Sequence, residues 1–338
     1  MKEVKNRINL GITSLFVLIS YLYGTYSSPF YQTNPWVDTN AMLTMGRAWL
    51  HGMIPFRDIF EQRGPVMYLI YLIAARISQI NFLGVFVMEV LFGFISFYLL
   101  TKIAQLFVKN QSFAYWVGYG AFLLTIGNVS FRYGGSPEQF ALPFILGLLY
   151  LILIKMCKDE DYTHKDFFVQ GMLLGTVFWL KYSLIGAWVG FFLFIAGYFL
   201  IQKKWIELLR VIASAVGGFL AISAPIIIYY SLVNGLKELI QAYFVLNLTT
   251  YGNANDNQSK IVQILQGMQR NFTPHVIAIN VFVLSLLVFL LHKQIKLKQK
   301  VLLTTVFGFQ AFFIYYSGHP YSYYFLPMTA FLAIIFIV

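Results

Sequence analysis

The sequence contains little cysteine and little charge. Cys157 is the single cysteine among 338 residues, so the chain can form neither an intrachain disulfide nor a cysteine-rich metal site. Charged residues make up 11% of the chain and only 13 residues are acidic, whereas 59% of the chain is hydrophobic. No short-period repeat, low-complexity tract or soluble globular domain is visible. This composition excludes a soluble enzyme and is typical of a polytopic membrane protein.

Apolar segments recur along the whole chain. A membrane-spanning helix needs about 20 apolar residues, and the sequence offers about ten such runs. We predict an all-α polytopic membrane protein with a single domain over residues 1–338, in which the N-terminal apolar run is a retained first span. The predicted spans are Ile8–Tyr26, Leu83–Phe107, Phe113–Ser130, Phe140–Lys155, Phe167–Leu180, Leu184–Ile201, Leu209–Tyr230, Val276–Leu291, Val301–Tyr316 and Tyr324–Val338.

The basic residues are distributed unequally between the two sides of these spans. If the N-terminus is cytoplasmic, fifteen of the 24 basic residues fall in short inner loops and inner helix ends. Because basic residues favour cytoplasmic loops, this asymmetry predicts a cytoplasmic N-terminus. The net charge of +11 is explained by topology, so we expect no nucleic-acid partner. The remaining nine lie in longer outer loops: Arg47, Arg57, Arg63, Arg76, Arg132, Lys181, Lys237, Lys260 and Arg270.

This topology leaves two long external segments, residues 27–82 and residues 231–275. Within the first segment, Val66–Ile80 is apolar but too short for a span. If it crossed the membrane, every later loop would lie on the opposite side. We interpret Val66–Ile80 and Met42–Leu50 as interfacial or re-entrant helices. The chain stops inside an apolar run at Val338, so the sequence is consistent with a longer protein whose C-terminal part is absent.

Charged residues concentrate in the first external segment. Asp38 lies in N-P-W-V-D-T-N, and R-D-I-F-E-Q-R-G-P holds Arg57, Asp58, Glu61 and Arg63. Ionisable residues beside membrane segments are costly and usually serve a function. We therefore predict that residues 27–82 form the catalytic loop.

Later connections bring further polar residues to the same outer side. They are Arg132 and Glu138 in R-Y-G-G-S-P-E-Q, Lys181 in W-L-K-Y-S, and His319 in S-G-H-P-Y-S-Y-Y. A carboxylate can act as general base towards an acceptor hydroxyl, and arginine or lysine can stabilise a leaving phosphate. An outer site has no ready access to nucleotide sugars, so the pattern favours glycosyl transfer from a lipid-linked sugar.

Each of these residues also fits a simpler role. Asp38 fits a helix N-cap, and Arg57 and Glu61 fit a surface ion pair if their segment is helical. Lys181 fits a side chain that extends to the membrane interface, and His319 fits an aromatic belt. A transporter or flippase of lipid-linked saccharides is the main alternative function, and a non-catalytic membrane scaffold is another.

At these motifs the chain resembles bacterial members of the GT-C glycosyltransferase superfamily. It is similar to the family 39 group, which includes the protein O-mannosyltransferases and the lipid A aminoarabinose transferases. The resemblance rests on Asp38 shortly after the first span and on the acidic motif from Asp58 to Pro65. The segment with Glu138 and the segment G-H-P-Y-S-Y-Y-F-L-P resemble two later recurrent elements. The chain departs from the aminoarabinose transferases at Gln62, where they have a basic residue.

The resemblance implies a GT-C-like bundle and roles for three residues. Asp38 is expected to be the general base or to position the acceptor, Glu61 to be the second catalytic carboxylate, and Arg63 to contact the donor phosphate. The predicted substrate-binding residues are Asp58, Arg57, Arg63, Arg132, Glu138, Lys181 and His319.

The predicted function is an inverting transfer on the outer face of a bacterial cytoplasmic membrane. The expected partners are a polyprenyl-phosphate-linked sugar donor, membrane lipid, and a cell-envelope glycan, lipid or protein acceptor. We expect no cofactor, and the alternative is Mg²⁺ or Mn²⁺ bound by Asp38, Asp58 and Glu61.

Overall fold

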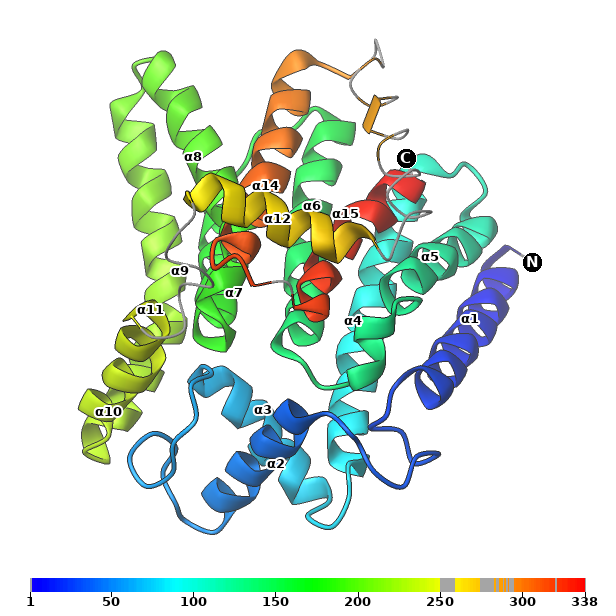
Figure 1. Cartoon of the computed structure of the whole chain (residues 1–338). Coiled ribbons are helices and arrows are strands. Elements are labelled where there is room, and N and C mark those ends of the chain that lie inside the picture. The colour runs from blue at the N-terminus through cyan, green and yellow to red at the C-terminus, as the bar shows by residue number, and fades with distance from the viewer. Residues whose placement is uncertain are drawn as a thin grey trace.

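The computed structural model describes residues 2–249, 259–273, 295–319 and 321–337, with single positions between 283 and 291. The described part is helical apart from turns and one isolated β-bridge between Pro55 and Ile59. Its elements, drawn in Figure 1, are α1 (Lys2–Gly24), α2 (Val37–Leu50), α3 (Pro65–Ile77), α4 (Leu83–Phe107), α5 (Gln111–Ile126), η1 (Val129–Tyr133), α6 (Pro137–Lys158), α7 (His164–Leu180), η2 (Tyr182–Leu184), α8 (Gly186–Ile201), α9 (Trp205–Leu232), α10 (Leu236–Ile240), η3 (Gln241–Val245), α11 (Leu246–Thr249), α12 (Lys260–Phe272), α14 (Leu297–Tyr315), η5 (Ser322–Phe325) and α15 (Leu326–Ile337).

Most predicted spans coincide with helices to within a few residues, and α4 matches its prediction at both ends. The largest difference is in α1, which begins at Lys2 and not at Ile8. The span predicted to reach Ser130 ends at Ile126, because Asn128 accepts a hydrogen bond from Phe131 and caps the separate turn η1. The last helix begins at Leu326, after η5. The predicted span Val276–Leu291 lies outside the described residues, apart from single positions.

Several helices have the length and composition of membrane spans. Within the described ranges, α1, α4, α6 and α9 are long and apolar enough to cross a membrane, and α3, α8 and the η5–α15 segment are apolar but shorter. Large apolar side chains such as Leu91, Leu220 and Ile228 point outward from these helices. An apolar outer surface of this extent is stable in lipid and not in water. The chain therefore has the fold of a helical membrane protein.

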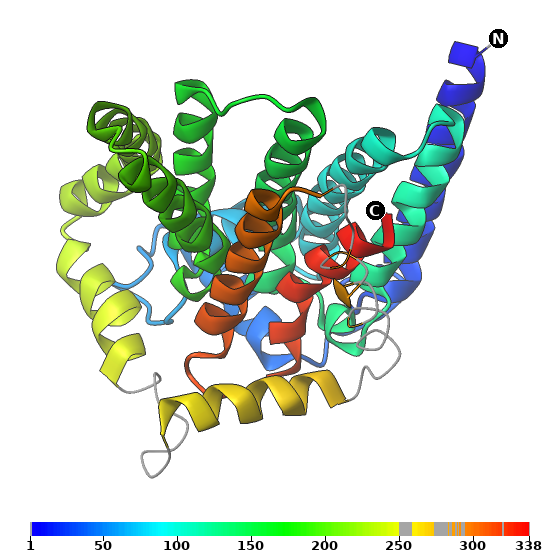
Figure 2. The ribbon, with the colours of Figure 1, turned by 90° about the horizontal axis from the view of Figure 1, so that it is seen from above.

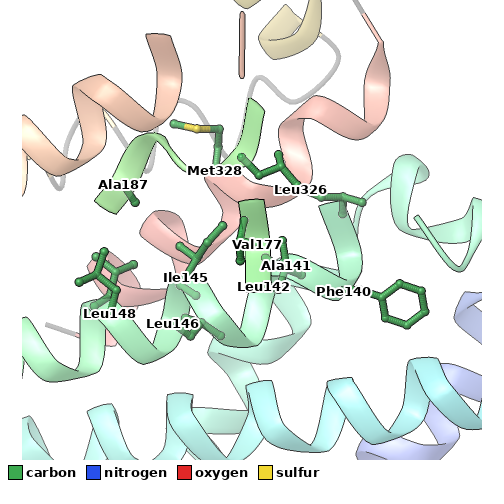
Figure 3. Close-up of a cluster of buried hydrophobic side chains, with 14 of the residues drawn as sticks. Phe140, Ala141, Leu142, Ile145, Leu146, Leu148, Val177, Ala187, Leu326 and Met328 are labelled. Atoms are coloured by element: carbon green, nitrogen blue, oxygen red, sulfur yellow. The ribbon is translucent and has the colours of Figure 1, made fainter. Parts of the chain in front are cut away.

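Helix α6 forms the centre of the bundle. Its side chains are buried on nearly every side, and it packs against α4, α7, α8 and α15. This packing fixes the start of α6, where Glu138 lies. Figure 3 shows part of the surrounding cluster, with Phe140, Ala141, Leu142, Ile145, Leu146 and Leu148 of α6, Val177 of α7, Ala187 of α8, and Leu326 and Met328 of α15.

Helices α2 and α3 form a separate layer across one end of the bundle, at the bottom of Figure 1. They pack closely on each other, because Gly46 has no side chain to meet the Tyr71 carbonyl. Helix α3 also contacts α4 and α7, which holds the layer against the bundle. Figure 2 shows that α12 instead lies along the side of the bundle.

Two hydrogen bonds fasten this layer to the turn before α6. Thr39 donates to the Gly134 carbonyl over 2.6 Å, and Tyr71 donates to the Gly135 carbonyl over 2.8 Å. Both glycines have positive φ, +74° and +68°, which other residues rarely adopt. The turn therefore brings α2 and the start of α6, with Glu138, to one place.

The loop before α3 is held against the end of α7 at Gly64. Its backbone N–H donates to the Leu180 carbonyl over 3.3 Å. A Cβ at Gly64 would lie 1.9 Å from the Trp179 carbonyl oxygen, which is far closer than atoms can approach. This contact places Arg63 next to Lys181 in space.

We predict that Gly64→Ala lowers the free energy of unfolding by about 1–3 kcal/mol, because the added methyl group must push the loop away from α7. Thermal unfolding of the purified protein in detergent measures the effect. Gly197→Ala is the matched control, because a Cβ there meets nothing within 4 Å. Equal unfolding temperatures for Gly64→Ala and the wild type would contradict this account of the loop.

Candidate functional site

Asp38 lies in the first turn of α2, as its second residue. The N-cap of α2 is Trp36, which makes no side-chain capping hydrogen bond, so the interpretation of Asp38 as the N-cap was wrong. The helix begins earlier than predicted because Val37 already has helical geometry. The Asp38 side chain is 29% exposed, which leaves it accessible to a substrate.

Arg63 joins Asp38 to Glu61. One guanidinium nitrogen of Arg63, Nη2, lies 2.6 Å from Asp38 Oδ2, and the other, Nη1, bonds Glu61 Oε1. The Arg63 and Glu61 side chains are 15% and 14% exposed. The backbone N–H of Arg63 also donates to Glu61 Oε2 over 3.0 Å. The structure thus brings three residues of the predicted catalytic loop into one cluster.

Tyr68 completes this cluster from the first turns of α3. Its hydroxyl donates to Glu61 Oε2 and lies 3.0 Å from the Arg63 backbone nitrogen. The sequence interpretation missed Tyr68, because one tyrosine in an apolar helix gives no signal of its polar partner. Glu61 accepts this hydrogen bond with one of its two carboxylate oxygens, which fixes the orientation of the carboxylate. Asp38 is therefore the less constrained of the two carboxylates.

The electrostatics of the cluster are dominated by the two carboxylates around one guanidinium. Burial lowers the pKa of Arg63, but Glu61 and Asp38 more than offset this and raise it above its usual value. Arg63 is therefore cationic at every physiological pH.

A second ion pair, between Glu138 and Lys181, lies at the ends of α6 and α7. Lys181 Nζ lies 2.5 Å from Glu138 Oε1 and over the rings of Tyr324 and Tyr323, at 4.8 and 5.3 Å from their centroids. The Glu138 side chain is fully buried, and its Oε2 has no hydrogen-bond partner. The interpretation of Lys181 as a side chain extending to the membrane interface was wrong, because the amine turns inward to Glu138.

Tyr323 lies between the two ion-pair clusters. It is within electrostatic range of Glu138, Asp38 and Arg63, and its ring contacts Lys181. Lys181 is in turn within electrostatic range of Arg63. The Asp38–Arg63–Glu61 cluster and the Glu138–Lys181 pair therefore share one electrostatic field. Within the described ranges, no three acidic, histidine or cysteine side chains are arranged as metal ligands.

Arg57 and Asp58 form a different contact. The Arg57 guanidinium binds the Asp58 carboxylate at 2.8 Å and donates to the Val233 carbonyl at the end of α9 over 2.7 Å. Arg57, together with the Ile54 backbone N–H, lowers the pKa of Asp58 to about 2. The proposed Arg57–Glu61 pair was wrong, because the segment is not helical and Glu61 bonds Arg63. This contact ties the loop to α9.

Arg132 and His319 lie outside the two ion-pair clusters. The Arg132 guanidinium lies 5.1 Å from the Tyr26 ring centroid. The His319 ring stacks on Tyr321, with centroids 5.1 Å apart, and Tyr321 stacks on Tyr323. His319 is therefore connected to the clusters through aromatic rings.

No family model, no curated protein and no solved structure matches this chain. What the site does must therefore be argued from its own residues.

A paired substitution separates the structural and functional roles of Glu138 and Lys181. We predict that Lys181→Met lowers the free energy of unfolding by about 3–5 kcal/mol, because it leaves the buried Glu138 charge unpaired. The double variant Glu138→Leu with Lys181→Met removes both charges and should recover most of that loss. Denaturant unfolding measures both effects.

The double variant should nevertheless lose the activity of the site, because Lys181 is a cation within electrostatic range of Arg63. A double variant that is both stable and fully active would show that the pair has only a structural role. Lys296→Met with Asp159→Asn is the control, because both side chains of that pair are exposed and asparagine tolerates the positive φ of residue 159, so its loss should change little.

Proposed function

We propose that the protein is a membrane glycosyltransferase of the GT-C superfamily, near the family 39 group. It transfers a sugar from a polyprenyl-phosphate-linked donor to a cell-envelope acceptor, with inversion at the anomeric carbon. The bundle has about ten spans, the N-terminus is cytoplasmic, and the site lies at the outer face of a bacterial cytoplasmic membrane.

The observation that carries this proposal is the position of Arg63 between Asp38 and Glu61. A guanidinium with planar, forked donors suits a phosphate, and it can exchange a carboxylate partner for a phosphate oxygen. Lys181 lies within electrostatic range and adds a second cation. Binding of the donor phosphate to Arg63 releases Asp38 from its ion pair. The released carboxylate is then available to accept a proton.

The proposed reaction is a single displacement. The acceptor hydroxyl oxygen forms a bond to the anomeric carbon while its proton passes to the Asp38 carboxylate. The bond between the anomeric carbon and the phosphate oxygen breaks, and its electron pair leaves with the polyprenyl phosphate. Arg63 stabilises the charge that develops on that oxygen. Glu61, oriented by Tyr68, keeps Arg63 in place.

The arrangement of the helices supports the proposed orientation. In Figure 1 the α4–α5, α6–α7 and α8–α9 connections and the start of α14 lie at the end opposite α2 and α3. Those connections hold many of the lysines that the charge count assigns to the cytoplasmic side, among them Lys109, Lys158, Lys203 and Lys296. The candidate site lies at the other end, beside the first external segment.

Glu89 is the observation that favours a transporter. It is fully buried in α4, and its Oε1 has no hydrogen-bond partner, whereas its Oε2 accepts from Gln139. Buried carboxylates within spans often serve ion pathways. Glu89 Oε1 lies close to Gly134, in the turn before α6, and a Cβ added to Gly134 would clash with this oxygen. That location links Glu89 to the same turn that positions Glu138, which also fits a transferase.

The general-base role of Asp38 gives a direct prediction. Asp38→Asn should lower the rate of sugar transfer by about 10²–10⁴-fold, because the amide cannot accept the acceptor proton. Turnover with a lipid-linked sugar donor measures it, and donor binding should persist. Asp159→Asn, an exposed carboxylate in the α6–α7 connection, is the control. Wild-type turnover of Asp38→Asn would move the base to another residue.

The proposed chemistry is independent of divalent metal. Asp38 and Glu61 already bind Arg63, and a cation between them would have to displace the guanidinium. The acidic residues Asp159, Glu160 and Asp161 lie in the α6–α7 connection, at the opposite end of the bundle.

We expect turnover to survive treatment with EDTA and to fall at least about 100-fold in Arg63→Ala, because the leaving phosphate loses its cation. Arg210→Ala, an exposed arginine at the start of α9, serves as the control. Activity that disappears in EDTA and returns with Mn²⁺ would assign Asp38 to a metal instead.

A further inference from the structure

A shallow depression lined by aromatic residues adjoins the candidate site. It has a volume of about 390 Å³. Its walls come from the segment before α2, from the end of η1 and from the start of η5. The lining residues are Pro35, Trp36, Tyr133, Tyr321, Ser322 and Tyr323. Segments far apart in the sequence thus form one surface.

The rings of the depression form two stacked pairs. Trp36 stacks on Tyr133 with centroids 5.5 Å apart and planes at 26°, and Tyr321 stacks on Tyr323 at 5.2 Å and 9°. Trp36 and Tyr323 meet at 5.7 Å and join the two pairs. Four rings from three segments therefore form a continuous aromatic surface.

The depression also borders the proposed general base. Trp36 precedes Asp38 by two residues, at the start of α2. Tyr321 is within electrostatic range of Asp38, and Tyr323 is within range of Asp38 and Arg63. A molecule resting on these rings is therefore placed near Asp38.

The chemistry of this surface fits a sugar ring. The faces of aromatic rings carry negative partial charge, and the C–H groups on one face of a pyranose carry positive partial charge, so the two attract when stacked. The hydroxyls of a sugar need polar partners at the edge, and Ser322 and the tyrosine hydroxyls supply them. A hydrocarbon chain would leave those hydroxyls without partners. The exposed position of Tyr321, at 45%, also suits a ligand that arrives from water.

We propose that this depression binds the acceptor, and that the acceptor is a saccharide. The inference rests on the proposed glycosyl transfer, because it names the substrate that Asp38 would deprotonate. The sugar ring lies against Trp36 and the exposed Tyr321, which line the depression, and one hydroxyl points to Asp38. The acceptor is then the end of an envelope glycan, not a protein side chain or the headgroup of a simple lipid.

Saturation-transfer NMR on the detergent-solubilised full chain tests the proposal without any donor. The probes are the methyl glycosides of glucose, galactose, mannose and N-acetylglucosamine. We expect at least one glycoside to bind the wild type, with the strongest transfer to the C–H protons on one face of its ring. Trp36→Ala and Tyr321→Ala should each weaken that binding about tenfold, and Trp36→Tyr should restore most of it.

The controls distinguish this inference from the proposed function. Trp205→Ala, an exposed tryptophan at the start of α9, should bind the glycosides like the wild type. Arg63→Ala should lose binding of polyprenyl phosphate and keep glycoside binding, whereas Tyr321→Ala should show the reverse. If no glycoside binds the wild type, or if Trp36→Ala and Tyr321→Ala bind like it, the saccharide proposal is overturned and the transferase proposal stands. Loss of polyprenyl phosphate binding in Tyr321→Ala would assign the depression to the donor instead and also overturn it.

Discussion

The bonds from Arg63 to Asp38 and Glu61 are the contact on which the site depends. They join the start of α2 to the loop before α3 and place one cation between two carboxylates. Burying such charges is costly unless each is paired and hydrogen-bonded, and Tyr68 supplies one of the further hydrogen bonds that this requires. The backbone contact at Gly64 then fixes the loop against α7. The chain has few charged residues, and burying several of them together lowers its stability. We therefore interpret the cluster as functional.

The sequence predicted the positions of most described helices well, because long apolar runs have few alternative structures in lipid. It also predicted that Asp38, Glu61 and Arg63 belong together. Composition can locate charges along the chain but cannot choose their partners. The sequence interpretation therefore paired Arg57 with the wrong carboxylate. The contact between Arg57 and Asp58 depends on the Val233 carbonyl, which is distant in the sequence, and on the backbone N–H of Ile54, an apolar residue.

The aromatic part of the site was harder to predict. In a membrane protein, tyrosine and tryptophan are common at interfaces, so Trp36 and Tyr323 have no distinctive pattern. These rings come into contact only in the folded chain, where the turn before α6 and the start of η5 meet the start of α2. The same folding brings the buried Glu138 to Lys181 and within electrostatic range of Tyr323. Charged and aromatic residues therefore form one site only in the folded chain, where Tyr323 contacts Lys181 and lies within electrostatic range of Asp38 and Arg63.

The central claim is that the cluster around Arg63 binds a lipid-linked sugar phosphate. Native mass spectrometry of the protein released from its own membrane tests this most directly, because any bound donor is weighed together with the chain. The account predicts a bound species with the mass of a sugar joined to a polyprenyl phosphate, and its loss from Arg63→Ala but not from Arg210→Ala. Absence of any polyprenyl phosphate species from the wild type, or equal occupancy in Arg63→Ala, would contradict the account.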